Sequence, residues 1–375
     1  MRVNRIAPLL ATAALLIAAC STSTRGSGEQ AIDVANAKIT GTVTVSPPAS
    51  MAGTLLISPD GRRVFGTKGA TPCVFDVDGS NDVCAGKEVS VDVSRAVWSP
   101  DGTHVAFTDD FYRMFWDPDI WVLDAATGQV TDLTDDGVAK VDLGHKDPKA
   151  NYDLLPRWSP DSKSVRFARQ AGDYAGPTID IDSVPVSGGQ VSRLGTLPGR
   201  LIELAGLSFA PDAKTMAWSQ GADSGWSKST VYVGPLGDPG KALSDQPVQG
   251  DQSLLSFSPD GTYLLVDSFA PYGQFSCCPR SSARVYRADG SDAQPVTKGA
   301  VALYPGWAPS GHALAFSTPI PHASVDLVAE PGGAAHVLES GEHRFGAPNT
   351  VRIQWTRAGL FVFQDTKPVV EQLGG

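Results

Sequence analysis

The chain has 375 residues, with 40 acidic against 30 basic side chains and a formal net charge of −10 at pH 7. An acidic surface repels phosphate backbones, so this charge argues against a nucleic-acid partner. The six His residues are scattered and the sequence has no Cys-x-x-Cys pair, so no metal site is expected.

The first twenty residues have the pattern of an export signal. A start that contains Arg2 and Arg5 is followed by an apolar run, residues 6–19, which is too short to span a bilayer comfortably. The run ends in Ile-Ala-Ala-Cys20, which resembles the bacterial lipobox, where the Cys becomes the lipid-bearing first residue. We expect residues 1–19 to be a lipoprotein signal peptide. The alternative is an ordinary signal peptide with an unrelated Cys.

Lipidation of Cys20 would anchor the exported chain in a membrane, at the cell surface or on the periplasmic side. Residues 20–36 then form the lipidated N-terminus and a flexible tether, because the segment after Cys20 is rich in Ser, Thr and Gly. Loss of residues 1–19 removes two arginines and no acid, so the formal charge falls from −10 to −12.

One motif recurs through the rest of the chain. An aromatic or aliphatic residue is followed by a version of Ser-Pro-Asp-Gly and then by a short apolar run. The seven copies begin at Ile57, Trp98, Trp158, Phe209, Phe257, Trp307 and Trp355. They extend over 298 residues in six intervals, a period of about 50 that is typical of propeller blades or solenoid units.

Each copy predicts a hairpin. In the copy that begins at Trp98, the tetrapeptide fits a type I β-turn with Pro at its second position and Gly at its fourth. A strand-like run follows, and then a second turn signal, such as Asp78-Gly79 or Thr127-Gly128, precedes a further short strand. Four short strands per repeat predict an all-β fold, a β-propeller of four-stranded antiparallel blades, with seven blades expected and six as the alternative.

The repeated acids are expected to be structural. A residue that recurs once per blade most often belongs to the turn itself, and this assignment covers Asp60, Asp101, Asp161, Asp212 and Asp260. The aromatic residues that open the copies, and those eight or nine positions later, are expected to pack between blades.

The last repeat is incomplete. After residues 360–363 there remains chain for only one further strand, which would leave a blade edge unpaired. The strand-like residues 37–45 are available to complete this blade. We therefore expect a single propeller domain over residues 37–375, closed by pairing of the N- and C-terminal strands.

Four cysteines remain beside Cys20, and four allow three pairings. Cys73 and Cys84 flank a turn and are candidates for a disulfide between adjacent strands. Cys277 and Cys278 are neighbours, which leaves either a strained vicinal disulfide or two thiols with other partners.

Loop insertions concentrate on one face of the predicted propeller. The repeat turns all belong to one face, so the insertions at residues 109–119, 137–155 and 269–281 fall on the opposite face. Their aromatic residues are candidate contacts for a ligand, or else fold back over the central channel. These residues are Phe111, Tyr112, Phe115, Trp116, Tyr272 and Phe275.

Four acids lie in the first insertion, namely Asp109, Asp110, Asp117 and Asp119. Carboxylates of this kind suit a hard cation such as calcium. We expect them instead to be solvated loop acids, and predict no metal.

Motifs for catalysis are missing from the sequence. It contains no G-x-S-x-G elbow, no H-E-x-x-H and no P-loop, and no His forms a recognisable pair with a nucleophile. The sequence therefore predicts no enzyme and no cofactor.

The copy at Trp98, with Val-Ala-Phe after its turn, and the later Asp119-Ile-Trp-Val-Leu-Asp resemble the WD40-like (PD40) propeller repeat of the TolB family. Proteins of that family are periplasmic, carry a small α/β domain before a six-bladed propeller and bind envelope proteins. This chain departs from them in its lipobox Cys20, in its seven copies and in having no room for the α/β domain.

The lipobox, the propeller repeats and the loop insertions together predict a monomeric, membrane-anchored propeller lipoprotein that binds an envelope protein, a peptide or a glycan at its loop-rich face without catalysis. The alternative is a hydrolase or lyase with its site at the mouth of the central channel, because propellers also host those chemistries.

Overall fold

The computed structural model describes residues 33–49, 51, 54–93, 95–109, 117–138, 148–172, 176–221, 229–243, 251–269, 283–318, 324–340, 352–363 and 368–374. The chain divides into two units, Met1–Ala31 and Ile32–Gly375, and every described strand lies in the second. In this described part, no helix is both long enough and apolar enough to cross a membrane.

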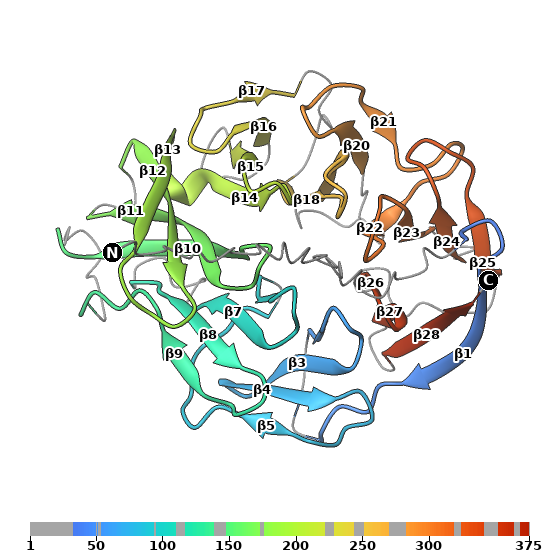
Figure 1. Ribbon diagram of the computed structural model, residues 1–375, viewed down its shortest axis with the longest axis horizontal. Helices are drawn as coiled ribbons and strands as arrows, with labels where there is room; N and C mark the ends of the chain where they lie inside the picture. The colour runs from blue at the N-terminus through green and yellow to red at the C-terminus, as the bar shows by residue number, and fades with distance from the viewer. Residues whose placement is uncertain are drawn as a thin grey trace, which may run out of the picture. The chain divides into compact units, whose positions relative to one another are not determined.

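Seven separate four-stranded antiparallel sheets follow one another around a ring, and β14, β18, β22 and β26 are seen nearest its centre in Figure 1. Blades 1 and 2 consist of β2 (Leu56–Ile57), β3 (Arg63–Lys68), β4 (Thr71–Asp76), β5 (Val83–Cys84), β6 (Val97–Trp98), β7 (His104–Thr108), β8 (Ile120–Asp124) and β9 (Val130–Asp132). Blades 3 and 4 consist of β10 (Asn151–Trp158), β11 (Ser164–Ala171), β12 (Thr178–Pro185), β13 (Ser192–Pro198), β14 (Leu204–Phe209), β15 (Thr215–Gly221), β16 (Ser229–Pro235) and β17 (Lys241–Ala242), with the short 3-10 helix η1 (Leu201–Glu203) before β14.

The remaining blades complete the ring. Blades 5 and 6 consist of β18 (Asp251–Phe257), β19 (Tyr263–Phe269), β20 (Arg284–Arg287), β21 (Gln294–Pro295), β22 (Leu303–Trp307), β23 (Leu314–Ser317), β24 (Ser324–Val328) and β25 (His336–Ser340). Blade 7 consists of β26 (Arg352–Thr356), β27 (Gly359–Phe363), β28 (Val369–Gly374) and β1 (Lys38–Thr44). All seven motif copies lie inside the ring, so seven blades are confirmed and the six-bladed alternative is wrong.

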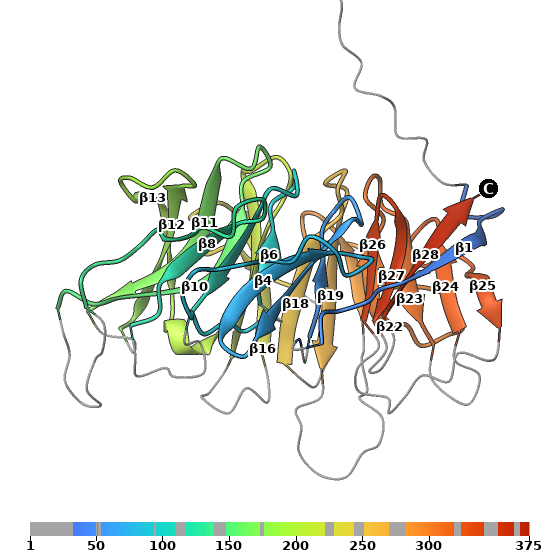
Figure 2. The ribbon, with the colours of Figure 1, turned by 90° about the horizontal axis from the view of Figure 1, so that it is seen from below.

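Blade 7 is built from both ends of the propeller. Strand β1 runs antiparallel to β28, with Lys38 opposite Gly374 and Thr44 opposite Val369, and the two strands lie side by side in Figure 2. The expected closure is therefore confirmed. It leaves no unpaired edge on β28, because the incomplete last repeat borrows its outermost strand from the N-terminal side.

The repeat turn uses its polar side chains for its own hydrogen bonds. In blade 2 the Gly102 N–H donates to Ser99 O (2.9 Å), and Ser99 Oγ donates to Asp101 Oδ1 (2.6 Å). The same Asp101 oxygen accepts the Thr103 N–H (3.0 Å). Gly102 has φ of +72°, a conformation that favours Gly.

The acid of the motif accepts the N–H two residues further on in four other copies as well, at Asp60, Asp161, Asp212 and Asp260. The structural assignment of these acids is confirmed.

Three of the four tryptophans that open the motif donate a hydrogen bond to a neighbouring blade, while the indole N–H of Trp355 has no hydrogen-bond partner among the described residues. The indole N–H of Trp98 donates to Leu56 O of blade 1 (3.0 Å), and that of Trp158 donates to Val97 O of blade 2 (2.9 Å). Trp307 makes the equivalent bond to Ser256 O of blade 5 (3.1 Å). Each acceptor directly precedes the motif of the previous blade, so the repeat specifies how blades join as well as how each blade turns. The packing of these aromatic residues between blades is confirmed.

Candidate functional site

The connections between strands separate into two faces. In blade 2 the turns from β6 to β7 and from β8 to β9 lie together, since His104 at the start of β7 pairs with Asp124 at the end of β8. The opposite ends of β7 and β8, at Thr108 and Ile120, open onto the other face. We call these the turn face and the loop face, and each blade repeats the arrangement.

The candidate binding aromatics Phe111, Tyr112, Phe115, Trp116, Tyr272 and Phe275 lie outside the described residues, as do Asp110, Cys20, Cys277 and Cys278. What the structure places on the loop face is the framework from which these loops leave, including the strand ends of blades 2, 3 and 5.

Two loop acids are buried where solvated ones were expected. Asp117 is 5% exposed and Asp119 is 7% exposed, so the expectation of solvated side chains is wrong for both. The reason lies in blade 3, where the Asp153 N–H donates to Pro118 O (2.8 Å) and holds this segment against the start of β10. Asp119 also begins the approach to β8, with its Oδ1 accepting from Thr134 Oγ1 (3.0 Å).

A cluster of acids gathers here, between blades 2 and 3 at the loop face. It draws on the loop before β8, on β9 and the turn after it, and on the start of β10. We define the acid cluster as Asp109, Asp117, Asp119, Asp132, Asp136 and Asp153. The topology explains the gathering, because the β7–β8 loop, the β9–β10 connection and the first residues of β10 all meet at this edge.

The deepest member of the cluster has a cationic partner. Asp153 is fully buried and accepts two hydrogen bonds from Arg169 on β11, one from Nε to Oδ1 (2.7 Å) and one from the guanidinium NH2 to Oδ2 (2.6 Å). Asp182 on β12 lies 3.8 Å from the same Nε. Burial raises the pKa of Asp153, against the effect of Arg169.

The pKa values of the acids nearer the β7–β8 loop are raised further than that of Asp153. Burial, followed by the negative charge of Asp136, raises the pKa of Asp117 to about 8. Burial, followed by the charge of Asp132, raises the pKa of Asp119 to about 9, even though Thr134 donates to it. Such shifts are typical of functional sites and also of structural charge networks.

The sequence reasoning missed Asp132, Asp136, Asp153, Arg169 and Asp182. A signal was present, since Asp153, Arg169 and Asp182 are charged residues that interrupt apolar strands of blade 3. A buried charge needs a partner, so three such residues in one blade predict an ion-pair network.

The described histidines serve the fold and stand apart from the acid cluster. His312 contacts Asp260 (2.5 Å) and Glu330 (2.8 Å) on the turn face, and His336 Nε2 lies 2.8 Å from Ala37 O at the ring closure. His104 packs against Trp158 of the next blade. The acid cluster therefore has acids and one guanidinium, with no described His in it.

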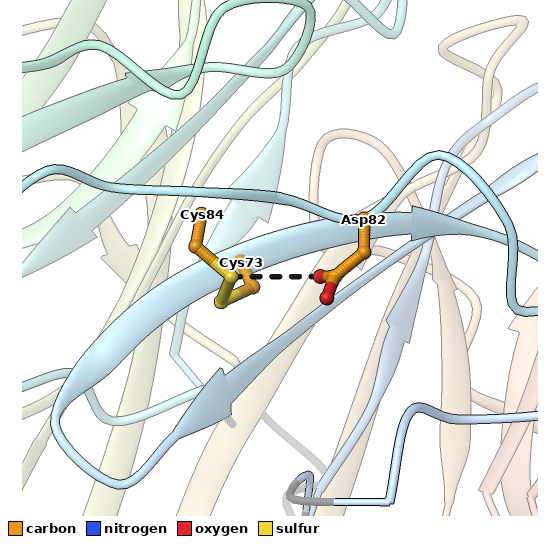
Figure 3. A group of neighbouring side chains, drawn as sticks. All are labelled: Cys73, Asp82 and Cys84. Carbon is orange, nitrogen blue, oxygen red and sulfur yellow. Dashed lines mark hydrogen bonds between the residues drawn. A yellow bond between two sulfur atoms is a disulfide. The ribbon is translucent and has the colours of Figure 1, made fainter.

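Cys73 on β4 and Cys84 on β5 lie opposite each other and are joined by a disulfide (Sγ–Sγ 2.08 Å). Asp82 Oδ1 lies 3.5 Å from Cys84 Sγ (Figure 3). These three side chains have the spacing of a metal-binding group. Because both sulfurs belong to the disulfide, neither offers the thiolate that such a site needs, and Asp82 pairs with Lys68 instead.

Comparisons with known proteins give the fold and no family. No protein-family profile matches the sequence, and no curated protein matches it. A chain in the crystal structure of the mitotic checkpoint complex is 12% identical, covers 91% of this chain and 97% of that chain, and aligns with a TM-score of 0.55. The fold is a seven-bladed β-propeller. At this level of identity the likeness supports the propeller fold alone.

A structure described as TolB from Agrobacterium tumefaciens is 18% identical and covers 87% of this chain and 90% of that chain, with a TM-score of 0.38. A score this low carries no argument about function. The propeller fold implied by the resemblance to TolB-like repeats is confirmed by the seven sheets, and membership of that repeat family stays a prediction.

Proposed function

We propose that this chain is an exported lipoprotein, anchored through Cys20, whose propeller binds an envelope protein, a peptide or a glycan at its loop face without catalysing a reaction. The observation that carries the proposal is the division of labour between the two faces. On the turn face, the polar side chains of the motif form hydrogen bonds within the turns of the blades. The insertions rich in aromatic residues occur instead at the connections of the loop face, and loops mounted on a scaffold of strands commonly carry binding function.

The binding part of the proposal is tested with the two largest aromatics of the first insertion. Envelope material captured by the wild-type protein is compared with that captured by a Phe111→Ala plus Trp116→Ala variant. Loss of the specific partner is expected, because aromatic anchors supply much of the energy of an interface. Val337→Ala is the matched control, since Val337 is a 51% exposed apolar residue on the outer strand β25, away from the loops. Unchanged capture by the double variant would refute the assignment of this loop.

The anchor is tested separately. A Cys20→Ala variant is expected to move from the membrane fraction to the soluble fraction, because the thiol that would carry the lipid is gone. Retention of the variant in the membrane fraction would refute lipidation and leave the binding proposal standing.

One observation favours the enzymatic alternative, namely the perturbed acids between blades 2 and 3. Raised carboxyl pKa values are what a general acid needs near neutral pH. A substrate could not reach Asp117, however, because both of its carboxylate oxygens are buried from solvent. A hydrolase or lyase would be revealed by new reducing or unsaturated ends in envelope polysaccharides, lost in an Asp119→Asn variant. We expect no turnover.

A further inference from the structure

Asp117 is the least compensated charge in the described part of the chain. Asp117 is 5% exposed, neither Oδ1 nor Oδ2 accepts a hydrogen bond from a described N–H or O–H donor, and its polar neighbour is the carboxyl of Asp136. An ionised carboxylate in that position costs several kcal/mol unless a positive charge meets it. Position 117 therefore calls for a cation or a proton.

The surroundings of Asp117 are negative. The carboxyl of Asp136 lies beside it, and the charges of Asp153 and Asp109 act on it next most strongly. Arg169, the nearest guanidinium of the network, is engaged by both oxygens of Asp153. Arg169 is therefore not available to neutralise Asp117.

Asp136 is held rigidly and faces this position. Its Oδ1 accepts the Val138 N–H (3.0 Å), and its Oδ2 accepts both the backbone N–H (2.7 Å) and the side-chain Nδ2 (2.8 Å) of Asn151. These donors fix the orientation of the Asp136 carboxylate. A carboxylate that is fixed by hydrogen bonds while it approaches a second carboxylate has the arrangement of a metal ligand with its outer shell in place.

We infer that Asp117 and Asp136 form the core of a binding site for one hard divalent cation, with calcium as the ion that fits best, between blades 2 and 3 at the loop face. Two carboxylates that share one Ca²⁺, each at about 2.3–2.6 Å, lie beside each other without repulsion, and water completes the irregular shell that Ca²⁺ tolerates.

Other occupants fit less well. A Lys or Arg side chain of a partner protein would need exposed oxygens, and those of Asp117 are buried. Zinc and copper prefer imidazole or thiolate ligands, and the described part of the acid cluster offers neither. Mg²⁺ demands near-ideal octahedral geometry, which a carboxylate of fixed orientation such as Asp136 adapts to less readily than to the irregular shell of Ca²⁺.

A cation in this place would connect the two blades. Asp117 precedes β8 of blade 2, and Asp136 is hydrogen-bonded to Asn151 at the start of β10 in blade 3. Bridging them would fix the base of the β7–β8 loop, which carries four of the candidate binding aromatics. The inference concerns this ion alone, so its test does not depend on whether the proposed partner binds.

The experiment is a metal titration of the full-length protein in detergent. Protein treated with EGTA is titrated with CaCl2 and, in parallel, with MgCl2 in an isothermal calorimeter. We expect one Ca²⁺ per chain, Mg²⁺ binding at least about tenfold weaker, and a rise of about 5 °C in the midpoint of thermal unfolding on addition of Ca²⁺.

Two Asp→Asn variants make the test specific. Asp117→Asn is expected to weaken Ca²⁺ binding at least about tenfold and to abolish the thermal shift. The control Asp78→Asn removes a fully exposed acid on the turn face, and should bind as the wild type does. If Asp117→Asn does not fold, Asp136→Asn replaces it in the same comparison, together with elemental analysis of the wild-type protein before EGTA treatment, where about one Ca²⁺ per chain is expected.

Several results would overturn the inference. One is a wild-type protein that takes up no divalent cation at about 10 mM, a concentration well above the weakest calcium sites of extracellular modules. Another is uptake that is the same in the wild type and in Asp117→Asn. A wild type that binds no cation, with Asp117→Asn melting higher, would show that the two carboxyls only share a proton.

Discussion

Blade 2 presents aspartates at both of its ends, and the two ends treat them in opposite ways. On the turn face, burial would raise the pKa of Asp101, but hydrogen bonds from Ser99 and Thr103 lower it overall. On the loop face, burial and neighbouring acids raise the pKa of Asp117 to about 8. The same residue type therefore stabilises the blade at one end and opposes folding at the other. A chain retains unfavourable charges mainly where they serve something other than folding.

The largest expected effect is at the ion pair beneath the loop face. Arg169→Met leaves Asp153 buried without its cation, and should lower the free energy of unfolding by about 3–5 kcal/mol. Urea unfolding of the purified protein measures it. Arg193→Met is the matched control, because Arg193 also pairs with Asp182 but is 58% exposed, so a loss under about 1 kcal/mol is expected. Equal losses in the two variants would show that the buried ion pair contributes no more to the free energy of unfolding than the exposed one.

A middle-sized effect should distinguish the two aspartates directly. In EGTA at pH 7, Asp117→Asn should raise the free energy of unfolding by about 1 kcal/mol, because Asn is always neutral, whereas Asp117, with its pKa raised to about 8, must take up a proton to be buried. Asp101→Asn should lower it by less than about 0.5 kcal/mol, because Asp101 is exposed and its hydrogen bonds are screened.

The sign for Asp117 follows from its raised pKa. The folded protein binds this proton more tightly than the unfolded chain does, so stability falls as the pH rises from about 4 towards about 8. Asp117→Asn should flatten this slope. Changes of the same sign in Asp117→Asn and Asp101→Asn would contradict the contrast between the faces.

The smallest effect concerns the turn face itself. Hydrogen bonds from His312 and Ser258 lower the pKa of Asp260 to about 2 against the effect of burial. Burial lowers the pKa of His312, but Glu330 and Asp260 raise it overall. The His312 contribution is complete below pH 6.5 and is lost as the pH rises through its raised value, whereas that of Asp260 is present above pH 3.8 and is lost as the pH falls towards 2.

Both contributions are therefore complete between about pH 4 and 6.5. A His312→Gln variant should lose the decline above pH 6.5, with a change of less than about 1 kcal/mol because the site is partly exposed. Thermal unfolding from pH 5 to 8 measures it. His104→Gln is the control on an equivalent turn of blade 2, where His104 Nε2 lies 3.7 Å from Asp124. A wild-type stability that does not change over this range would contradict the assignment.

Most of the fold could be predicted from the sequence because its information is local and repeated. The Ser-Pro-Asp-Gly turn closes through hydrogen bonds within five residues, and seven copies of a local rule count the blades. The closing strand could also be predicted, since an incomplete repeat at one end needs a strand from the other. The indole bonds between blades could not, because they depend on where a backbone carbonyl of a neighbouring blade lies.

The acid cluster could not be predicted from the sequence for a related reason. Asp117 lies in a run of loop acids that looks solvated, and its burial depends on blade 3, through the bond from the Asp153 N–H to Pro118 O. Asp136 follows β9 and comes near Asp117, which precedes β8, because these two strands pair in blade 2. Spacing along the chain carries no trace of that approach.

The sequence by itself determined the number of blades, the turn at each hairpin and the way the ring closes. It could do so because each of these follows from short-range hydrogen bonding or from counting repeats. Only the tertiary structure decided which acids lose their water, which of them find Arg169 and which remain unpaired. Desolvation depends on all the atoms packed around a group. Here those atoms come from two blades whose contacting residues are separated along the sequence.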